Sequence, residues 1–309
     1  MSSEPVSRLR PFHIVDVFAD QKFAGNQLAV VRNAMDFPET GYQRFAREMN
    51  FSETTFIMIN ENELDGRTDI PFTVRIFTPK LELPFAGHPT LGTAFVIQQY
   101  ILRKKVPKIV LDLKIGPIEV TPEYESMSDG VKLLWMKQNE PKFSKTTVTS
   151  EQVSKVLGLQ PGDFDATFPI QDVSTGVPFL IIPLKSMTAL KKCKVDKEKY
   201  YALIRKTKAK SFLVFSPGSH GTDSQLSVRM FSDYFGVPED PATGSGNGCL
   251  AGYLSRYKYF GSDRVDTQVD QGYEIGRPST LFLKTSPERK AVNISVGGHV
   301  VPVAEGALL

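Results

Sequence analysis

The segment V-R-I-F-T-P-K-L-E-L-P at residues 74–84 decides the fold, because the chain carries a second copy of it, V-R-M-F-S-D-Y-F-G-V-P, at residues 228–238. The two copies align over a shift of 154 residues without a gap. Each copy then runs into a glycine-rich turn, A-G-H-P-T-L-G at 86–92 and A-T-G-S-G-N-G at 242–248. A repeat of this length indicates two halves with the same architecture.

A weaker echo supports the duplication, since A-G-N-Q-L-A-V-V (24–31) precedes the first copy and T-G-V-P-F-L-I-I (175–182) precedes the second. The same order of strands and helices is therefore expected in both halves. The expected elements lie at about 11–19, 27–32, 38–49, 53–59, 72–78 and 90–103, and again at about 167–173, 178–183, 196–205, 212–216, 225–232 and 246–258.

The helix expected at 90–103 carries apolar residues on nearly all of its faces, which is typical of a helix wrapped by sheet. The patterns together predict an α+β fold of two lobes related by a pseudo-twofold axis. Each lobe is expected to be a curved, mixed β-sheet or barrel around one central helix.

The predicted first lobe comprises residues 1–125 plus about 295–309, and the second comprises 126–294. A polar, turn-rich stretch near 122–130 marks the expected join. The last strands, at about 290–304, are expected to cross back to the first lobe.

Composition excludes several classes of protein. The 309 residues include 37 basic and 34 acidic side chains, a net charge of +3 that is too small for a nucleic-acid-binding surface. The longest apolar stretch, about 178–184, is too short to span a membrane, and the N-terminus has no apolar signal region. Only Cys193 and Cys249 are present, which argues against a disulfide framework or a thiolate zinc site. A cytoplasmic protein without a membrane or nucleic-acid partner is expected.

Each glycine-rich turn leads into a helix N-terminus, where free backbone N–H groups and the positive dipole end attract anions. Gly244, Ser245 and Gly246 could therefore bind the carboxylate or phosphate of a small metabolite. Alternatively, the glycines serve only close packing of sheet and helix. Phosphate-loop, dinucleotide-binding and serine-hydrolase motifs all fail here, since the required lysine, third glycine and flanking glycines are missing.

Three ionisable residues are candidates for chemistry: Glu53, His88 and Asp240. Glu53 lies in the apolar, strand-like segment N-F-S-E-T-T-F-I-M-I, where burial would raise its pKa towards the range that a general acid/base needs. A water-facing edge-strand glutamate, a helix-capping histidine and an aspartate in a turn are the alternatives. Aligning the two halves places Ala209 opposite Glu53, so one base is expected rather than two.

The chain resembles the phenazine-biosynthesis PhzF-like isomerases, which are fold relatives of diaminopimelate epimerase. The resemblance rests on ordered strings that cover nearly the whole chain: D-V-F-A-D-Q-K-F-A-G-N-Q-L-A-V-V, N-F-S-E-T-T-F, R-I-F-T-P-K-L-E-L-P-F-A-G-H-P-T-L-G-T-A, G-V-P-E-D-P-A-T-G-S-G and V-G-G-H-V-V-P-V-A-E-G. It implies paired β-barrels around central helices, an active site between the lobes, no metal, no organic cofactor and a homodimer.

The resemblance also implies roles for individual residues. Glu53 matches the family's acid/base glutamate, His88 the histidine of G-H-P-T, and Asp240 and Ser245 the acid and serine of D-P-A-T-G-S. Gly87 stands where the epimerase relatives carry a catalytic cysteine. Amides around Gly87 and from Gly244 to Gly246 would then bind the anionic end of the substrate.

In the phenazine enzyme, a proton leaves one ring carbon of trans-2,3-dihydro-3-hydroxyanthranilate and returns at another. The sequence thus predicts a cofactor-independent isomerase that acts on a small anionic metabolite with carboxylate and amino or hydroxyl groups. Gln27, where the family string reads G-N-P, and the Gly-Asn-Gly after Ser245 depart from the family near the expected substrate. A two-base racemase or epimerase and a non-catalytic metabolite-binding protein are the alternatives.

Overall fold

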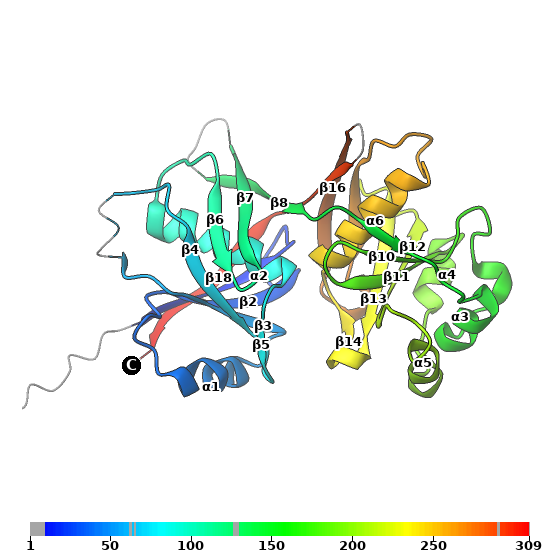
Figure 1. Ribbon diagram of the computed structural model, residues 1–309, viewed down its shortest axis with the longest axis horizontal. Coiled ribbons are helices and arrows are strands. Elements are labelled where there is room, and N and C mark those ends of the chain that lie inside the picture. The colour runs from blue at the N-terminus through cyan, green and yellow to red at the C-terminus, as the bar shows by residue number, and fades with distance from the viewer. Residues whose placement is uncertain (1–9, 62–63, 65, 126–129, 289–290, 309) are drawn as a thin grey trace, which may run out of the picture.

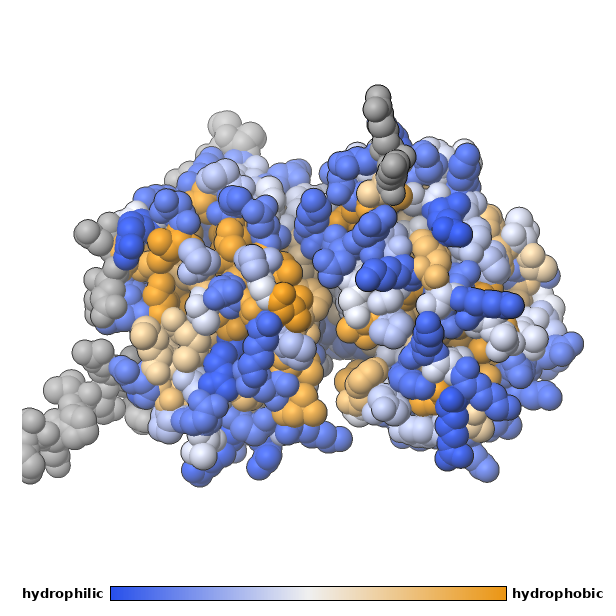
Figure 2. Space-filling view, in the orientation of Figure 1, coloured by the Kyte–Doolittle hydropathy of each residue, from blue (hydrophilic) through white to orange (hydrophobic). Residues whose placement is uncertain are grey.

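A computed structural model describes residues 10–61, 64, 66–125, 130–288 and 291–308. Two lobes lie side by side, each with a sheet curved around a helix (Figure 1). A notch separates their lower parts in the space-filling view (Figure 2). The predicted join near 122–130 includes residues 126–129, which lie outside the described residues, and the exact division into lobes stays a prediction.

The first half of the chain contains β1 (Arg10–Val17), β2 (Asn26–Val31), α1 (Glu39–Met49), β3 (Glu53–Ile57), β4 (Phe72–Phe77), β5 (Glu82–Leu83), α2 (Gly87–Val96) with a π-helical extension (Ile97–Leu102), β6 (Ile109–Leu113), β7 (Gly116–Tyr124), β8 (Val131–Gln138) and β9 (Lys142–Ser144). The second half contains α3 (Ser150–Leu157), β10 (Gln171–Ser174), β11 (Pro178–Pro183), α4 (Met187–Lys192), α5 (Lys197–Ile204), β12 (Ser211–Pro217), β13 (Leu226–Ser232), β14 (Val237–Asp240), α6 (Gly244–Arg256), β15 (Asp266–Gln271), β16 (Ser279–Pro287), β17 (Val292–Gly298) and β18 (Val300–Leu308).

The strand pairings are duplicated. In the first half β1–β2 is antiparallel, β2–β3 parallel, β3–β4 antiparallel and β4–β6 parallel. In the second half β10–β11, β11–β12, β12–β13 and β13–β15 repeat this series in the same order and directions. The predicted α+β fold with a duplicated, mixed sheet is therefore confirmed.

Each half gives its last strand to the other lobe. β9 follows β8 but pairs with β10, and β18 follows β17 but pairs with β1. β8 and β17 pair with each other in antiparallel fashion, with Met136 opposite Val296. The sheet is therefore continuous across the two lobes.

The central helices are buried because their sequences carry almost no charge. All ten residues of α2 are buried, and so are Gly246–Ser255 of α6. Both helices begin earlier than the sequence pattern predicts, at Gly87 and Gly244 rather than near residues 90 and 246. The glycine-rich turns are thus the first turns of the helices themselves.

The arginine of the repeated R-x-F motif makes the same contacts in both halves. Arg75 of β4 forms a bidentate pair with Glu82 of β5, and its guanidinium lies 5.0 Å from the ring centre of Phe77. Arg229 of β13 pairs in the same way with Glu239 of β14 and lies 5.0 Å from the ring of Phe231. The motif therefore fixes each short strand that precedes a central helix.

Substituting Gly92 tests how closely α2 fits its sheet. A Cβ atom there would lie 2.6 Å from Leu28 Cδ2 and 2.8 Å from Val17 Cγ2. We expect Gly92→Ala to lower the free energy of unfolding by about 1–3 kcal/mol in urea titrations, because the core is already filled. Gly162→Ala is the control, since no atom lies within 4 Å of its new Cβ. Equal stability of the two variants would contradict this packing.

Candidate active site

The N-termini of α2 and α6 meet between the lobes at Gly87 and Gly244. A Cβ atom on Gly87 would lie 3.2 Å from the amide nitrogen of Ser245 and 3.4 Å from Gly244 Cα. Neither N-cap residue, Ala86 nor Thr243, makes a capping hydrogen bond with its own side chain. Two positive dipole ends with free N–H groups therefore converge on one place.

Glu53 is the first residue of β3 and lies opposite Leu28 in the parallel pair with β2. Its side chain is only 16% exposed. Burial raises the pKa of Glu53 to about 8, and the negative charge of Asp240 adds to the shift. Glu53 is thus protonated for most of the time at neutral pH yet able to lose its proton there.

His88 is the second residue of α2, and its Nε2 lies 3.4 Å from Glu53 Oε2. Burial lowers the pKa of His88 to about 3, against a smaller opposing effect of a hydrogen bond to the Gln27 backbone. Among the described residues Nε2 has no hydrogen-bond partner, so the nitrogen that donates to Gln27 is Nδ1. The neutral ring therefore presents the lone pair of Nε2 towards Glu53. Since both groups are uncharged at neutral pH, the contact is not an ion pair.

Asp240 ends β14 and reaches the site from the second lobe. Burial raises its pKa to about 6, while hydrogen bonds from Thr243 and Asn26 oppose the shift. Asp240 therefore stays ionised near neutrality. The structure brings together all three residues that the sequence singled out as catalytic candidates: Glu53, His88 and Asp240.

The substrate-binding candidates differ in what surrounds them. Gly87, Gly244 and Ser245 lie where the two helices meet, so their amides are placed to bind an anion. A Cβ on Gly246 would lie 2.8 Å from Leu213 Cδ1, so the Cα of this residue faces the core of the second lobe. Only the backbone N–H of Gly246 is left to bind a ligand. Binding by these four residues stays a prediction.

Asn26 and Gln271 were not predicted as site residues. Asn26, at the start of β2, donates to Asp240 Oδ1 at 2.9 Å and to the Ala242 carbonyl at 3.0 Å, and so links the lobes. Gln271, at the end of β15, donates to the Asp240 carbonyl at 2.9 Å. Asn26 stands in the G-N-Q string that resembles the family, whereas Gln271 follows an ordinary strand pattern and carries no such signal.

The strand registers correct the alignment of the two halves around Glu53. Leu28 pairs with Glu53, and its counterpart Phe179 pairs with Ser211. Ser211, not Ala209, is therefore the residue equivalent to Glu53. Its hydroxyl lies 2.6 Å from that of Ser232. The second lobe thus has a serine where the first has the carboxylate.

Other kinds of site were also considered. No group of three metal-binding side chains is found in the described residues. In the same part of the chain, no helix combines the length and apolarity needed to cross a membrane. Cys193 and Cys249 are buried, and burial raises their thiol pKa to about 12 and about 11. A cavity of about 380 Å³ beside Tyr100 and Arg103 lies at the other end of the α2 helix.

Comparisons with known proteins identify the relatives of this chain. A family model described as phenazine biosynthesis-like protein matches residues 15–306. The trans-2,3-dihydro-3-hydroxyanthranilate isomerase of Pseudomonas fluorescens is 33% identical over 96% of this chain and 98% of its own length. An uncharacterized isomerase of Mesorhizobium japonicum is 29% identical over 97% of this chain and 98% of its own.

Solved structures share the fold. A phenazine biosynthesis protein of the PhzF family from Bacillus anthracis superimposes with a TM-score of 0.86 at 24% identity, covering 98% of this chain and 99% of that one. A hydroxyproline epimerase from Agrobacterium vitis gives 0.59 at 9% identity, covering 98% and 91%. With the family model matching nearly the full length, the chain belongs to the phenazine biosynthesis-like (PhzF) family, whose named relatives include isomerases.

Proposed function

We propose that this protein is an isomerase that moves a proton within a small carboxylated metabolite, with Glu53 as the acid/base and with neither metal nor organic cofactor. The observation that carries the proposal is a buried glutamate beside two converging, uncapped helix N-termini. A pKa of about 8 suits a group that must both accept and return a proton near neutrality.

The helix N-termini supply the binding site for the anionic end of the substrate. Amides of Gly87, Gly244, Ser245 and Gly246 carry partial positive charge and are fixed by the fold. Such prearranged donors stabilise the charge that develops when a proton leaves carbon. Asp240, ionised and buried, complements a substrate ammonium or hydroxyl group, and the lone pair of His88 Nε2 accepts a hydrogen bond from the same side.

The proton path needs only one base. Glu53 takes the proton from one carbon and gives it back at another, so that the double bonds shift and no atom is gained or lost. The isomerases at 33% identity lead us to propose a substrate that resembles trans-2,3-dihydro-3-hydroxyanthranilate, with carboxylate, amine and hydroxyl groups. We further propose a homodimer in the cytoplasm as the working form.

The arrangement speaks against a two-base racemase or epimerase. Such an enzyme needs a second base on the opposite face of the substrate. Ser211 occupies the position equivalent to Glu53, and the other carboxylate of the site, Asp240, is proposed to bind the substrate. Gly87 also lacks any side chain that could act there. A non-catalytic binding protein would share the anion site but would exchange no proton.

Replacing Glu53 tests the proposed chemistry. Wild type and Glu53→Gln are incubated in D₂O with trans-2,3-dihydro-3-hydroxyanthranilate and with small amino and hydroxy acids. We expect deuterium uptake or a new isomer with wild type, and a loss of at least about 100-fold in the variant, because the amide cannot accept the proton. Mass and retention time are both followed, since an isomer formed without exchange keeps its mass.

Glu140→Gln, which changes an exposed carboxylate, is the control and should keep wild-type activity. Equal turnover by Glu53→Gln would remove Glu53 from the mechanism. Binding of these acids without any exchange or isomerisation would favour the metabolite-binding alternative.

The pH dependence of kcat/KM follows from the raised pKa of Glu53. Only the ionised carboxylate accepts a proton, so its fraction rises about tenfold per pH unit until the pKa is reached. We expect kcat/KM to increase in this way from about pH 6 and to level off near pH 8. A profile that is flat over this range would show that another group is the base.

The same pKa predicts an effect on stability. Since the pKa of Glu53 is raised in the folded protein, its contribution is fully present at low pH and is lost as pH rises through about 8. Glutamine stays neutral, so the Tm of Glu53→Gln should exceed that of wild type by several degrees at pH 9 and by less at pH 6. Thermal unfolding at both pH values measures this, and an unchanged difference would refute the buried, shifted carboxyl.

A further inference from the structure

The amide of Gln271 is fixed in one orientation by its neighbours. Its Oε1 accepts hydrogen bonds from Asn247 Nδ2 at 2.9 Å and from the Thr243 amide at 3.2 Å. Its Nε2 donates to the Asp240 carbonyl at 2.9 Å and to Thr243 Oγ1 at 3.1 Å. A flipped amide would place donor against donor, so this assignment is the one that satisfies all four contacts.

The orientation of Gln271 determines the direction of the Thr243 hydroxyl. A hydroxyl has one proton, and this oxygen already accepts from Gln271. Its proton is therefore available for Asp240 Oδ2, with which it forms a short hydrogen bond. Asn26 donates to the other oxygen, Oδ1. Both carboxylate oxygens of Asp240 thus receive hydrogen bonds, which favours the ionised form of a buried acid.

The charge of Asp240 in turn acts on Glu53. Two buried carboxylates that interact do not both ionise readily, so the better stabilised one keeps the charge and the other keeps the proton. His88 packs against Glu53 from α2 and is neutral. Arg277, on the loop after β15, is engaged with Asp16 and with the carbonyls of Ala24 and Gly25. Burial is the larger cause of the raised pKa of Glu53, and the charge of Asp240 adds to it.

We propose that Gln271 is a positioning residue of the acid/base pair: it directs the Thr243 hydroxyl at Asp240, and so keeps the negative charge on Asp240 and the proton on Glu53. The proposal rests on the function assigned above, in which Glu53 moves the proton. Gln271 acts through Thr243 and Asp240 and contacts no reacting atom itself.

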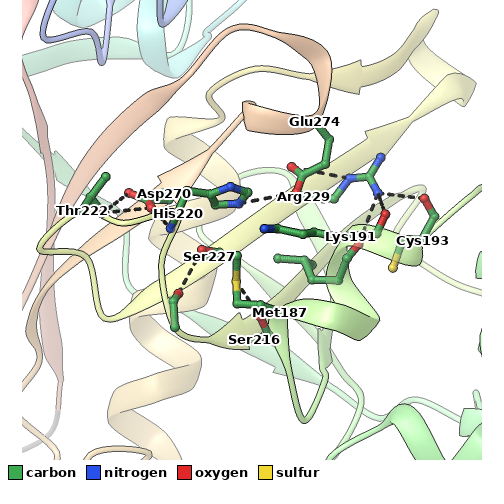
Figure 3. A network of polar contacts seen from close by, with 12 residues as sticks. Met187, Lys191, Cys193, Ser216, His220, Thr222, Ser227, Arg229, Asp270 and Glu274 are labelled. Atoms are coloured by element: carbon green, nitrogen blue, oxygen red, sulfur yellow. Dashed lines mark hydrogen bonds and ion pairs between the residues drawn. The ribbon is translucent and has the colours of Figure 1, made fainter.

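The opposite face of the same strand supplies a matched control. Successive residues of a strand point to opposite faces, so Asp270 points away from the site. It belongs to the polar cluster of Figure 3, where Thr222 Oγ1 donates to both of its carboxylate oxygens at 2.9 Å. Thr222→Val removes the hydroxyl that donates a hydrogen bond to the buried carboxylate of Asp270, as Thr243→Val does for Asp240. Asp270, however, is not part of the acid/base pair.

The test titrates the pair directly. Carboxyl ¹³C NMR of protein labelled in Glu and Asp side chains is followed with pH, and Glu53→Gln and Asp240→Asn assign the two signals. In Thr243→Val and in Gln271→Met we expect the pKa of Asp240 to rise and that of Glu53 to fall by about one unit. Thr243→Ser keeps the hydroxyl and should titrate like wild type, and so should Thr222→Val.

Kinetics give a second measurement. The rising part of the curve of kcat/KM against pH should move to lower pH by about one unit in Thr243→Val and Gln271→Met. At a fixed pH on this part, kcat/KM relative to its own plateau should then be about tenfold higher than in wild type. A purely structural role would lower kcat without moving this part of the curve.

The outcomes separate the two proposals. Wild-type titration of Glu53 in Gln271→Met overturns the positioning role, whether or not the enzyme turns over. A shift in Thr243→Val alone also overturns the role of Gln271. Shifted titrations in both variants support the role, even if wild type proves inactive and the proposed function fails. If Thr243→Val does not fold, the Gln271→Met titration still decides.

Discussion

Two helix N-termini touch backbone to backbone at Gly87 and Gly244, and the site exists because the fold holds them there. Two positive dipole ends at this distance repel each other, so each needs negative charge nearby. Asp240 supplies part of it, and an anionic substrate would supply more. A side chain on Gly87 would meet the Ser245 amide at 3.2 Å, so the closeness of the helices depends on the absence of a Cβ there.

Several contacts between the lobes hold this junction. Asn26 links the first lobe to Asp240, and Arg277 links the second lobe to Asp16. Phe18 adopts a φ of 62°, rare for an aromatic residue, and its buried ring packs against Gly298 and Gly244. The backbone of Phe18 is held there because its amide donates to the His299 carbonyl at 2.8 Å. The position of Asp240 relative to Glu53 and His88 is thus a property of the interface rather than of either lobe.

The repeat in the sequence was enough to predict the duplicated sheet, because the strand that carries the R-x-F motif has the same residues in both copies. The glutamate partners were not predicted, because Glu82 and Glu239 lie 157 residues apart and the gap-free shift of 154 places Gly236 opposite Glu82. Strands β6, β7 and β8 were not among the predicted elements. In β7, four of the nine residues are exposed, and Pro117 and Pro122 interrupt the strand pattern. The residue opposite Glu53 was misplaced by two positions, because the apolar strings F-I-M-I (56–59) and F-L-V-F (212–215) match when they are shifted by two residues. Only the strand registers show the correct match.

Glu53, His88 and Asp240 could be predicted from local strings and from a family resemblance. Gln271 could not, because its importance comes from hydrogen bonds to residues 24 to 31 positions away, and those depend on how β15 lies against α6. Asn26 differs, because it stands in the G-N-Q string of the family resemblance, although the residue that it contacts, Asp240, lies 214 residues away. Sequence patterns report periodicity and local chemistry, and they carry no signal for a polar side chain that acts through such contacts.

The exchanged strands β9 and β18 have a consequence for how a molecule with two copies of the repeat could arise from a chain with one copy. A chain with one copy of the repeat would present an unpaired edge on β1 or β10 and a terminal strand that its own lobe does not accommodate. It could satisfy both by exchanging that strand with a second identical chain, as a domain-swapped dimer. Duplication and fusion would then turn an intermolecular exchange into an intramolecular one and free the two halves to diverge, so that one kept a carboxylate where the other has Ser211.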